Sequence, residues 1–349
     1  MVRKSFPSIE CKLHPDTEIL NFDYEAVTFT DTNQKNNDCI NSLLNKFSDL
    51  LGKENDGTGE WKWLQENKQK EFIKSMISKD VKSISPFLTN MFRTEATYGY
   101  LSPSYADAIA DPKQVSSDIL SNIDSCAEFT DLSDIKQLAS SFGNPYGLVS
   151  DNGVILPDTP RHFYYSHIIS SLIGSVSSPY IVEIGGGYGG LCLENWRRFS
   201  GECTIVSIDL MPSLIATYYF LNMNGVPVNL VSHDEGEIKA NFVNLICAVD
   251  SDSLSRIIPK CDLIFNSRSL CEMGSDTVAT YFEFINNCET GYFYHENSNF
   301  LLFPDSERHI EVLADDFPVD ILKYTLQSKY ITPFTGGDGR YREYIYKTA

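Results

Sequence analysis

The stretch Tyr180–Trp196, YIVEIGGGYGGLCLENW, places five glycines in six positions directly after an apolar, β-branched run. A strand that ends in glycines and opens a helix lets a ligand approach the bare backbone, and the helix N-terminus offers free N–H groups and a positive dipole. The spacing satisfies G-x-G-x-x-G from Gly185, and it also satisfies E-x-G-x-G-x-G through Glu183, Gly185, Gly187 and Gly189. Either pattern indicates a nucleoside- or dinucleotide-binding turn.

Glu183 distinguishes between a nucleoside cofactor and a dinucleotide. A dinucleotide lays a pyrophosphate on the glycine loop, which a carboxylate at the end of the strand would oppose, whereas S-adenosylmethionine brings a sulfonium and an α-ammonium, which a carboxylate favours. We therefore expect S-adenosylmethionine as the cofactor. The alternatives are a dinucleotide on the same glycines and a tight packing turn without a ligand.

Two more carboxylates follow predicted strands. Asp209 ends the strand CTIVSIDL, where it can accept both ribose hydroxyls of a nucleoside. It can equally cap the helix that starts at Pro212, and the two roles are compatible. Asp250, at the end of the expected third strand, can reach the adenine amino group.

These residues must be positioned by alternating strands and helices, which begin after Pro160. The expected strands are Tyr180–Ile184, Cys203–Ile208, Asp262–Asn266 and Tyr292–His295, and the expected helices are Arg161–Gly174, Gly190–Phe199, Pro212–Asn224 and Asp276–Cys288. This alternation predicts an α/β fold with a mostly parallel sheet and helices on both faces.

The third strand is ambiguous. Val228–Val231 and Val243–Val249 could each be the third strand, and we favour Val243–Val249 because only a short connection then separates it from the strand at Asp262, with the earlier segment as an inserted hairpin strand. At the C-terminus, VDILKY and YREYIY are expected to be the last two strands, joined through the turn-rich FTGGDGR.

Residues 1–155 are expected to form a mainly helical N-terminal region, and residues 156–349 the cofactor-binding domain. Helices are expected at Cys39–Leu51, Trp61–Ser78, Lys113–Cys126 and Leu132–Phe142. The first region is expected to be a cap over the acceptor cleft or a dimerisation element, and thus the basis of a homodimer.

Composition excludes several classes of protein. The net charge of −19, from 47 acidic and 28 basic residues, disfavours a nucleic-acid partner. There is no run of the ~18 apolar residues needed for a transmembrane segment, and no secretory signal is expected. The nine cysteines are scattered without a C-x-x-C pair, which argues against a zinc knuckle or a disulfide framework and favours a cytoplasmic location.

Two blocks carry a family resemblance. VEIGGGYGG with IDLMPSLIATYYFLN resembles the class I methyltransferases, and DLIFNSRSLCEMGSDTVATYFEFI followed by GYFYHEN resembles the sugar O-methyltransferases found with bacterial surface-polysaccharide gene sets. The resemblance covers about residues 155–349. It implies a Rossmann-like, seven-stranded methyltransferase sheet whose final hairpin is formed by the two C-terminal strands.

The resemblance also implies roles. Glu183 and the three glycines of the motif would hold the methionine portion of the cofactor, and Asp209 its ribose. The block after the fourth strand, which faces the transferable methyl group, matches at Asn266, Ser269, Glu272 and Met273. Cys271 stands where the family carries a polar residue.

Methyl transfer to a hydroxyl is an in-line displacement that also needs removal of a proton. We expect His295 to be the general base, since imidazole titrates near neutral pH and this residue ends a predicted strand facing the cleft; the alternative is a histidine in a buried hydrogen-bond network. Glu272 can be the base, orient His295, or pair with Arg268.

The expected acceptor-binding residues are Arg161, His162, Arg268 and Asn297. The first two can instead be exposed helix residues. Glu272 and Glu296 could supply oxygen ligands to a cation, but no carboxylate cluster has the required spacing, so no metal is expected.

The leading hypothesis is an S-adenosylmethionine-dependent O-methyltransferase acting on a sugar or glycan acceptor of a surface polysaccharide or its precursor. The alternatives are a methyltransferase for another small molecule, a dinucleotide oxidoreductase, and an inactive methyltransferase-like partner subunit.

Overall fold

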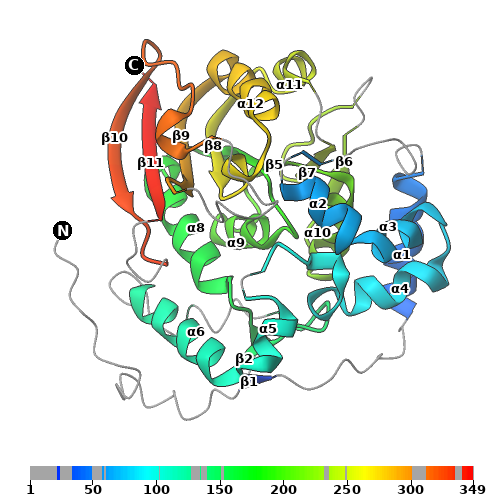
Figure 1. The fold of residues 1–349 in the computed structure, drawn as a ribbon. Coiled ribbons are helices and arrows are strands. Elements are labelled where there is room, and N and C mark those ends of the chain that lie inside the picture. Colours follow the sequence, from blue (N-terminus) through cyan, green and yellow to red (C-terminus); the bar gives the residue numbers. More distant parts are fainter. Residues whose placement is uncertain are drawn as a thin grey trace.

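An eight-stranded sheet with helices on both faces forms the centre of the molecule, and a three-stranded sheet, β1-β2-β3, lies apart from it (Figure 1). The computed structural model describes residues 22–23, 34–48, 57–58, 60–101, 103–126, 134, 140–150, 153–231, 236–247, 250–300, 312–334 and 340–348.

The helices are α1 (Gln34–Lys46), α2 (Glu60–Asn67), α3 (Lys70–Ile77), α4 (Val81–Thr89), α5 (Tyr105–Ala110), α6 (Pro112–Cys126), α8 (Thr159–Ile173), α9 (Gly190–Arg198), α10 (Met211–Met223), α11 (Ser251–Ile257) and α12 (Ser275–Asn287). Short 3-10 turns are η2 (Met91–Arg93), η3 (Glu95–Thr97), η4 (Leu270–Glu272) and η5 (Ala314–Asp316). The strands are β1 (Phe22–Asp23), β2 (Gly147–Ser150), β3 (Gly153–Ile155), β4 (Tyr180–Ile184), β5 (Thr204–Asp209), β6 (Val228–Leu230), β7 (Val243–Cys247), β8 (Lys260–Ser267), β9 (Glu289–Ser298), β10 (Tyr324–Ile331) and β11 (Tyr341–Thr348).

The order of the large sheet is β10-β11-β9-β8-β4-β5-β7-β6. All neighbours from β9 to β6 pair in parallel, whereas β11 is antiparallel to both β9 and β10. The chain builds outward from β4 through β5 and then crosses to β8 on the other side of β4. Strands β4 and β8 therefore flank the topological switch point, where open α/β sheets bind ligands outside the carboxyl ends of their strands.

This strand order confirms the expected fold class: a Rossmann-like methyltransferase sheet that is mostly parallel and ends in an antiparallel hairpin. It has one strand more than the seven expected, because Val228–Leu230 is an edge strand. The expectation of a hairpin strand there was wrong, since β6 pairs in parallel with β7. Val243–Cys247 is the third strand, as favoured.

The C-terminal hairpin is shifted relative to the expectation. Its first strand begins only at Tyr324, the last residue of VDILKY, and continues to Ile331. The preceding residues form a turn in which the backbone N–H of Leu322 donates to the Asp320 carboxylate over 2.9 Å. That carboxylate favours the turn over an extended strand. The second strand contains YREYIY as expected.

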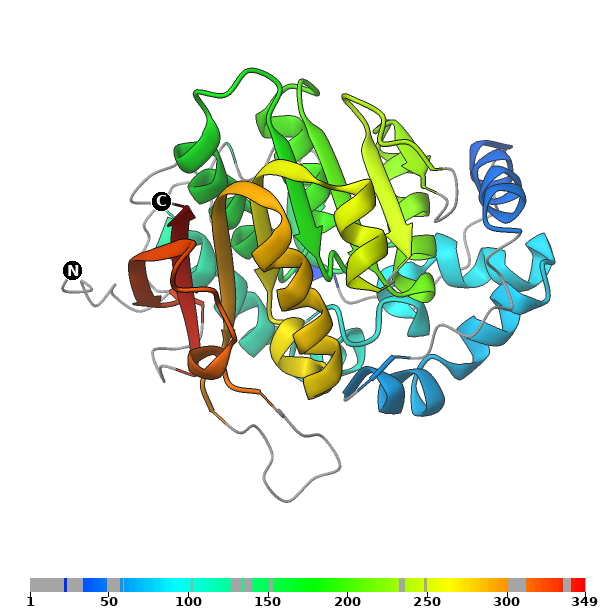
Figure 2. The ribbon, with the colours of Figure 1, turned by 90° about the horizontal axis from the view of Figure 1, so that it is seen from above.

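Two helical layers cover the sheet (Figures 1 and 2). Helices α11 and α12 pack on one face through residues such as Leu254, Tyr281 and Phe282, while α8, α9 and α10 pack on the other. Because successive strand residues point to opposite faces, Ile181 joins the core under α8 and α9, whereas Val182 joins the core under α12.

Helix α10 is buried on every side, and twelve of its residues are buried. A helix that is apolar all round must be covered on its outer face, and α1 provides this cover (Figure 1). Tyr219 Oη donates to Asn36 Oδ1 over 3.0 Å, and the Ser42 and Tyr218 hydroxyls lie 3.0 Å apart. The N-terminal helices therefore share one core with the sheet domain.

The helices expected at Lys113–Cys126 and Trp61–Ser78 are present, the latter as α2 and α3 with a break at Lys68–Gln69. Most of the helix expected at Leu132–Phe142 lies outside the described residues. None of the helices in the described part of the chain has the length and apolar character of a membrane span.

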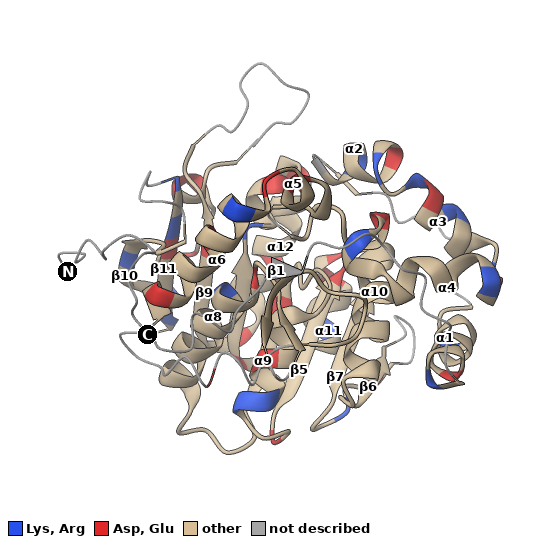
Figure 3. Cartoon of the chain, turned by 90° about the horizontal axis from the view of Figure 1, so that it is seen from below, with Lys and Arg blue, Asp and Glu red and all other residues tan. Residues whose placement is uncertain are grey.

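Acidic and basic residues lie side by side on α1, α3 and β11 (Figure 3). The eight cysteines in the described segments are buried and none of them forms a disulfide there, and Cys11 lies outside those segments.

Candidate functional site

The candidate site lies at the carboxyl edge of β4, β5, β8 and β9, where the glycine loop follows β4. Gly185, Gly187 and Gly189 all have positive φ, at 73°, 57° and 86°. These left-handed conformations strain any residue with a Cβ. Gly189 is also the N-cap of α9, so the loop leads directly into a helix N-terminus.

The lack of space around the loop requires glycine, in addition to the backbone conformation. A Cβ at Gly185 would lie 2.0 Å from Ser269 Oγ, and one at Gly186 would lie 2.2 Å from Ser207 Oγ. The loop therefore packs without side chains against both neighbouring strand ends.

Asp209 joins the end of β5 to the glycine loop. Its Oδ2 accepts from the backbone N–H of Gly187 over 2.8 Å, and its Oδ1 accepts from the N–H of Leu210 over 2.6 Å. Burial raises the pKa of Asp209 to about 6, against the effect of a hydrogen bond from Ser213 and these two N–H groups. The carboxylate lies where a nucleoside ribose was expected, but it is not the N-cap of α10, which is Leu210.

Glu183 lies deeper than expected. Its side chain points toward α9, where Cys192 Sγ donates to Oε2 over 3.0 Å, and the residue is 5% exposed. Burial raises the pKa of Glu183 to about 7. The expectation of an anion at the open lip of the strand is thus not met, because the carboxyl group sits under the loop near Gly186.

The block after β8 is tied to the glycine loop by amide side chains. Asn266 Nδ2 donates to the Ile184 carbonyl over 2.8 Å, and Asn297 Nδ2 donates to Asn266 Oδ1 over 2.8 Å. Asn297 Oδ1 in turn accepts from the N–H of Cys271. Both asparagines are fully buried, so they orient the block and do not present free amides to a ligand.

Arg268, whose side chain is 21% exposed, and the fully buried Glu296 form an ion pair beside this block. Arg268 Nε and Nη2 donate to the two Glu296 carboxylate oxygens over 3.1 and 3.2 Å, and Tyr165 Oη donates to Oε2 over 2.6 Å. Burial alone would raise the pKa of Glu296, but the charges of Arg268 and Arg161 outweigh burial and hold it below its ordinary value. Arg268 has a φ of 63°, a strained conformation for a residue with a side chain.

Arg161 and His162 are not exposed helix residues. They lie in the first turn of α8, where Arg161 pairs with the buried Asp158 over 3.1 Å and its Nε has no partner among the described residues. A Cβ at Gly190 would lie 2.5 Å from the His162 ring, so this histidine packs against the start of α9. Burial and the two arginine charges lower the pKa of His162 well below its ordinary value.

His295 does not end its strand. Strand β9 continues to Ser298, and the His295 ring is fully buried, stacked 4.5 Å from Tyr344 and close to Phe293 and Phe317. Burial lowers the pKa of His295 to about 3. Its Nε2 has no partner among the described residues. The expectation that this ring faces the cleft from a strand end was wrong.

Glu272 and Asp250 have different surroundings. Glu272, in η4, is half-buried and accepts from Trp61 Nε1 over 3.2 Å. Asp250 follows β7 by three residues, is exposed, and caps α11 by accepting from the Ser253 N–H over 2.8 Å. No group of three or more His, Cys, Asp or Glu residues in the described segments is arranged to hold a metal ion.

Several site residues were missed from the sequence. Asp158 and Tyr165 contribute to the charged cluster, and Glu343 of β11 accepts from the Tyr164 and Tyr294 hydroxyls over 3.0 and 2.9 Å. Burial raises the pKa of Glu343 to about 7. One signal in the sequence could have indicated these residues. The segment RHFYYSHII puts charged and tyrosine side chains on the first turns of an expected helix.

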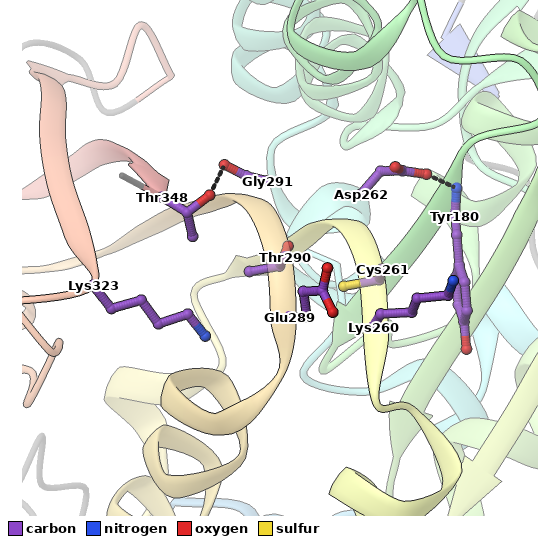
Figure 4. Close-up of a pocket in the computed structure, with 9 residues that line it drawn as sticks. All are labelled: Tyr180, Lys260, Cys261, Asp262, Glu289, Thr290, Gly291, Lys323 and Thr348. Carbon is purple, nitrogen blue, oxygen red and sulfur yellow. Dashed lines mark hydrogen bonds between the residues drawn. The ribbon is translucent and has the colours of Figure 1, made fainter.

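A separate pocket of about 780 Å³ lies at the opposite, amino edge of the sheet (Figure 4). Two of its polar groups have internal partners: Asp262 accepts from the Tyr180 N–H, and Lys323 Nζ donates to carbonyls at the end of α12. The thiols of Cys261 and Cys288 lie 3.8 Å apart beside it. This pocket is remote from the glycine loop and takes no part in the candidate site.

Comparisons with known proteins reach only part of the chain. TrmN from Thermus thermophilus is 14% identical, with a TM-score of 0.37 over 54% of this chain and 49% of that one. An O-methyltransferase family protein from Burkholderia thailandensis is 10% identical, with a TM-score of 0.38 over 55% and 57% of the two chains. The magnesium protoporphyrin IX methyltransferase ChlM from Synechocystis PCC 6803, with bound SAH, is 10% identical, with a TM-score of 0.37 over 55% and 85%.

This chain therefore spans about half the length of the first two structures. No family model and no curated protein matches it. The strand order carries the fold assignment.

Gly185→Ala should destabilise the protein by several kcal/mol, because a strained left-handed alanine (about 1–2 kcal/mol) is added to an overlap with Ser269. Gly225→Ala is the matched control: φ there is 80°, and no atom lies within 4 Å of the added Cβ. Denaturant unfolding of both variants isolates the packing contribution, and Ser269→Gly should partly rescue Gly185→Ala. Equal losses in the two variants would contradict the proposed packing of the loop.

Glu183 should make stability depend on pH. The pKa of Glu183 is raised from 4.5 to about 7 in the folded protein. Its contribution to the free energy of unfolding is therefore fully present below about pH 4.5 and is lost as the pH rises through 7. The shift corresponds to about 3 kcal/mol as an order of magnitude. In Glu183→Gln this loss between pH 5 and pH 8 should be absent, while the other buried acids affect both proteins alike. Parallel stability curves for the two proteins, measured by denaturant unfolding, would show that Glu183 is ionised throughout.

Proposed function

We propose that this protein is an S-adenosylmethionine-dependent O-methyltransferase whose acceptor is a sugar or glycan hydroxyl. The observation that carries the proposal is the contact between Asp209 and the Gly187 N–H at the switch point of the sheet. This contact supports the proposal because a carboxylate, the group that would accept ribose hydroxyls, lies beside a bare backbone and the N-terminus of α9.

The strand order supports a methyl donor over a dinucleotide. Dinucleotide-binding sheets continue with a sixth parallel strand, whereas this sheet continues with an antiparallel hairpin, β10 and β11. Glu183 also favours a methyl donor over a dinucleotide. Its effect is weaker than its sequence position suggested, because its carboxyl group lies beneath the glycine loop and not at the open edge of the strand. A cationic donor above the loop would favour its ionised form, and a pyrophosphate would oppose it.

The acceptor side supports a polyhydroxy substrate. Paired charges and phenols gather near the carboxyl ends of β8 and β9, including Arg268 with Glu296 of β9, Arg161 with Asp158, and Tyr165. Such pairs are locally neutral, yet they offer many donors and acceptors, which suits sugar hydroxyls better than a strongly charged or apolar acceptor.

Of the two predicted bases, we assign proton removal to Glu272. It follows β8 at the proposed methyl position and is half-buried, so it can reach a bound ligand. His295 is enclosed by aromatic rings and has a pKa of about 3, which leaves a weak base without access. We give His295 a packing role, with Asn297 3.4 Å from its Nδ1.

Asp209→Asn should weaken S-adenosylmethionine binding at least ~30-fold, since charge-assisted hydrogen bonds to two ribose hydroxyls are lost. Asp252→Asn is the control and should change the dissociation constant less than about twofold, because Asp252 is an exposed residue in the first turn of α11. Isothermal titration calorimetry of the three proteins measures this. Binding of NAD but not of S-adenosylmethionine by the unchanged protein would refute the proposed function.

Glu272→Gln should leave donor affinity within about twofold and slow methyl transfer by ~10²–10⁴, as expected for loss of a general base. The readout is S-adenosylhomocysteine formation against free hexoses and nucleotide sugars. His295→Asn should retain transfer while lowering the melting temperature. Loss of transfer in folded His295→Asn together with an active Glu272→Gln would reverse the assignment. Donor binding with no turnover on any acceptor would favour the inactive partner subunit.

A further inference from the structure

Tyr100, from the N-terminal region, covers the bare face of the glycine loop. A Cβ at Gly187 would lie 3.7–3.8 Å from the Tyr100 side chain, which means that the ring rests on the position a ligand would approach. The hydroxyl lies 2.7 Å from Ser213 Oγ, in the first turn of α10. Burial and the nearby charge of Asp209 raise the pKa of Tyr100. The phenol thus lies beside the carboxylate proposed to bind ribose.

Trp61 of α2 links this tyrosine to the acceptor side. Its ring stacks on Tyr100 with centroids 5.1 Å apart and planes 25° apart. Its indole N–H donates to Glu272 Oε2 over 3.2 Å. Two stacked rings therefore connect the proposed ribose carboxylate to the proposed base.

The backbone around the pair is built for this contact. Gly99 has a φ of 94°, and a Cβ there would lie 3.0 Å from Leu64 and 3.4 Å from Trp61, so only glycine allows the approach. Gln69 Nε2 donates to the Tyr98 carbonyl over 3.1 Å. Just before α2, which carries Trp61, the Thr58 hydroxyl lies 2.9 Å from the hydroxyl of Thr277, in the first turn of α12.

We propose that Tyr100 and Trp61 form a gate that occupies the ribose place in the free protein and that the methyl donor must displace to bind. This proposal rests on the proposed function and names residues that control its donor site. Because Tyr100 covers Gly187 and engages Ser213, a ribose bonded to Asp209 and the ring of Tyr100 compete for the same space.

Displacement of the gate has a consequence for Glu272. When Tyr100 moves, Trp61 loses its stacking partner, and the hydrogen bond that Trp61 donates to Glu272 is released with it. A carboxylate freed of that donor is a stronger base. Donor binding therefore prepares Glu272 for the acceptor, and the donor binds first.

Tyr100→Ala should tighten S-adenosylmethionine binding at least fivefold in calorimetry, because the competing side chain is removed. Tyr100→Phe keeps the ring but loses the contact with Ser213, and it should tighten binding by a smaller factor. Tyr98→Ala is the matched control: this residue belongs to the same turn, its ring lies near Lys68, and the change should leave affinity within twofold. Unchanged or weaker binding by folded Tyr100→Ala would overturn the gate.

Tryptophan fluorescence gives a second test that needs no change at Tyr100. Trp61, Trp63 and Trp196 are the tryptophans of the chain, and donor binding should alter the emission of the unchanged protein but not that of Trp61→Phe. Donor binding without any Trp61-dependent change would count against the gate while leaving the proposed function intact. If neither the unchanged protein nor Tyr100→Ala binds the donor, the proposed function falls and the gate falls with it.

Discussion

The site depends on how closely the glycine loop approaches its two neighbours. On one side the Gly187 N–H reaches Asp209, and on the other Gly185 leaves no room for a Cβ beside Ser269. Each contact is possible only because the loop has no side chains there and adopts left-handed conformations. The loop thereby fixes the end of β5 relative to the block after β8, so one short segment sets the distance between the proposed donor and acceptor sides.

Burial of charge is the second constraint on the acceptor side. Removing Arg268 would leave the fully buried Glu296 carboxylate without a compensating charge, which costs several kcal/mol. Arg268 and Glu296 are therefore locked to one another, and Tyr165 adds a third bond to the same carboxylate. The strained backbone at Arg268 fits this arrangement, because surrounding contacts must fix such a conformation. We infer that the cluster orients an acceptor and does not itself take up a proton.

Local pattern predicted the elements that are long and regular. Tyr180–Ile184 matched its expected bounds, and α8, α9, α10 and α12 were placed within a few residues, because each joins a clear apolar period to a glycine or proline boundary. The pairing of Val228–Leu230 was wrongly predicted because a three-residue strand does not reveal the direction in which it pairs. The surroundings of His295 and Glu183 were equally hidden, since sequence gives the position of a side chain along a strand but not which helix covers that face.

The contacts of Trp61 and Tyr100 lie further still from local pattern, because they join residues more than a hundred positions apart to Ser213 and Glu272. Their origin can nevertheless be traced to one feature of the sequence. Helix α10 is apolar all round, so its outer face must be covered, and α1 covers it while η3 packs on the same helix. Once the N-terminal helices are held there, the turn after η3 carries Tyr100 to the start of α10, next to Asp209. A requirement of packing thus brings an aromatic pair to the entrance of the site, and the N-terminal region becomes part of the site through the core that it completes.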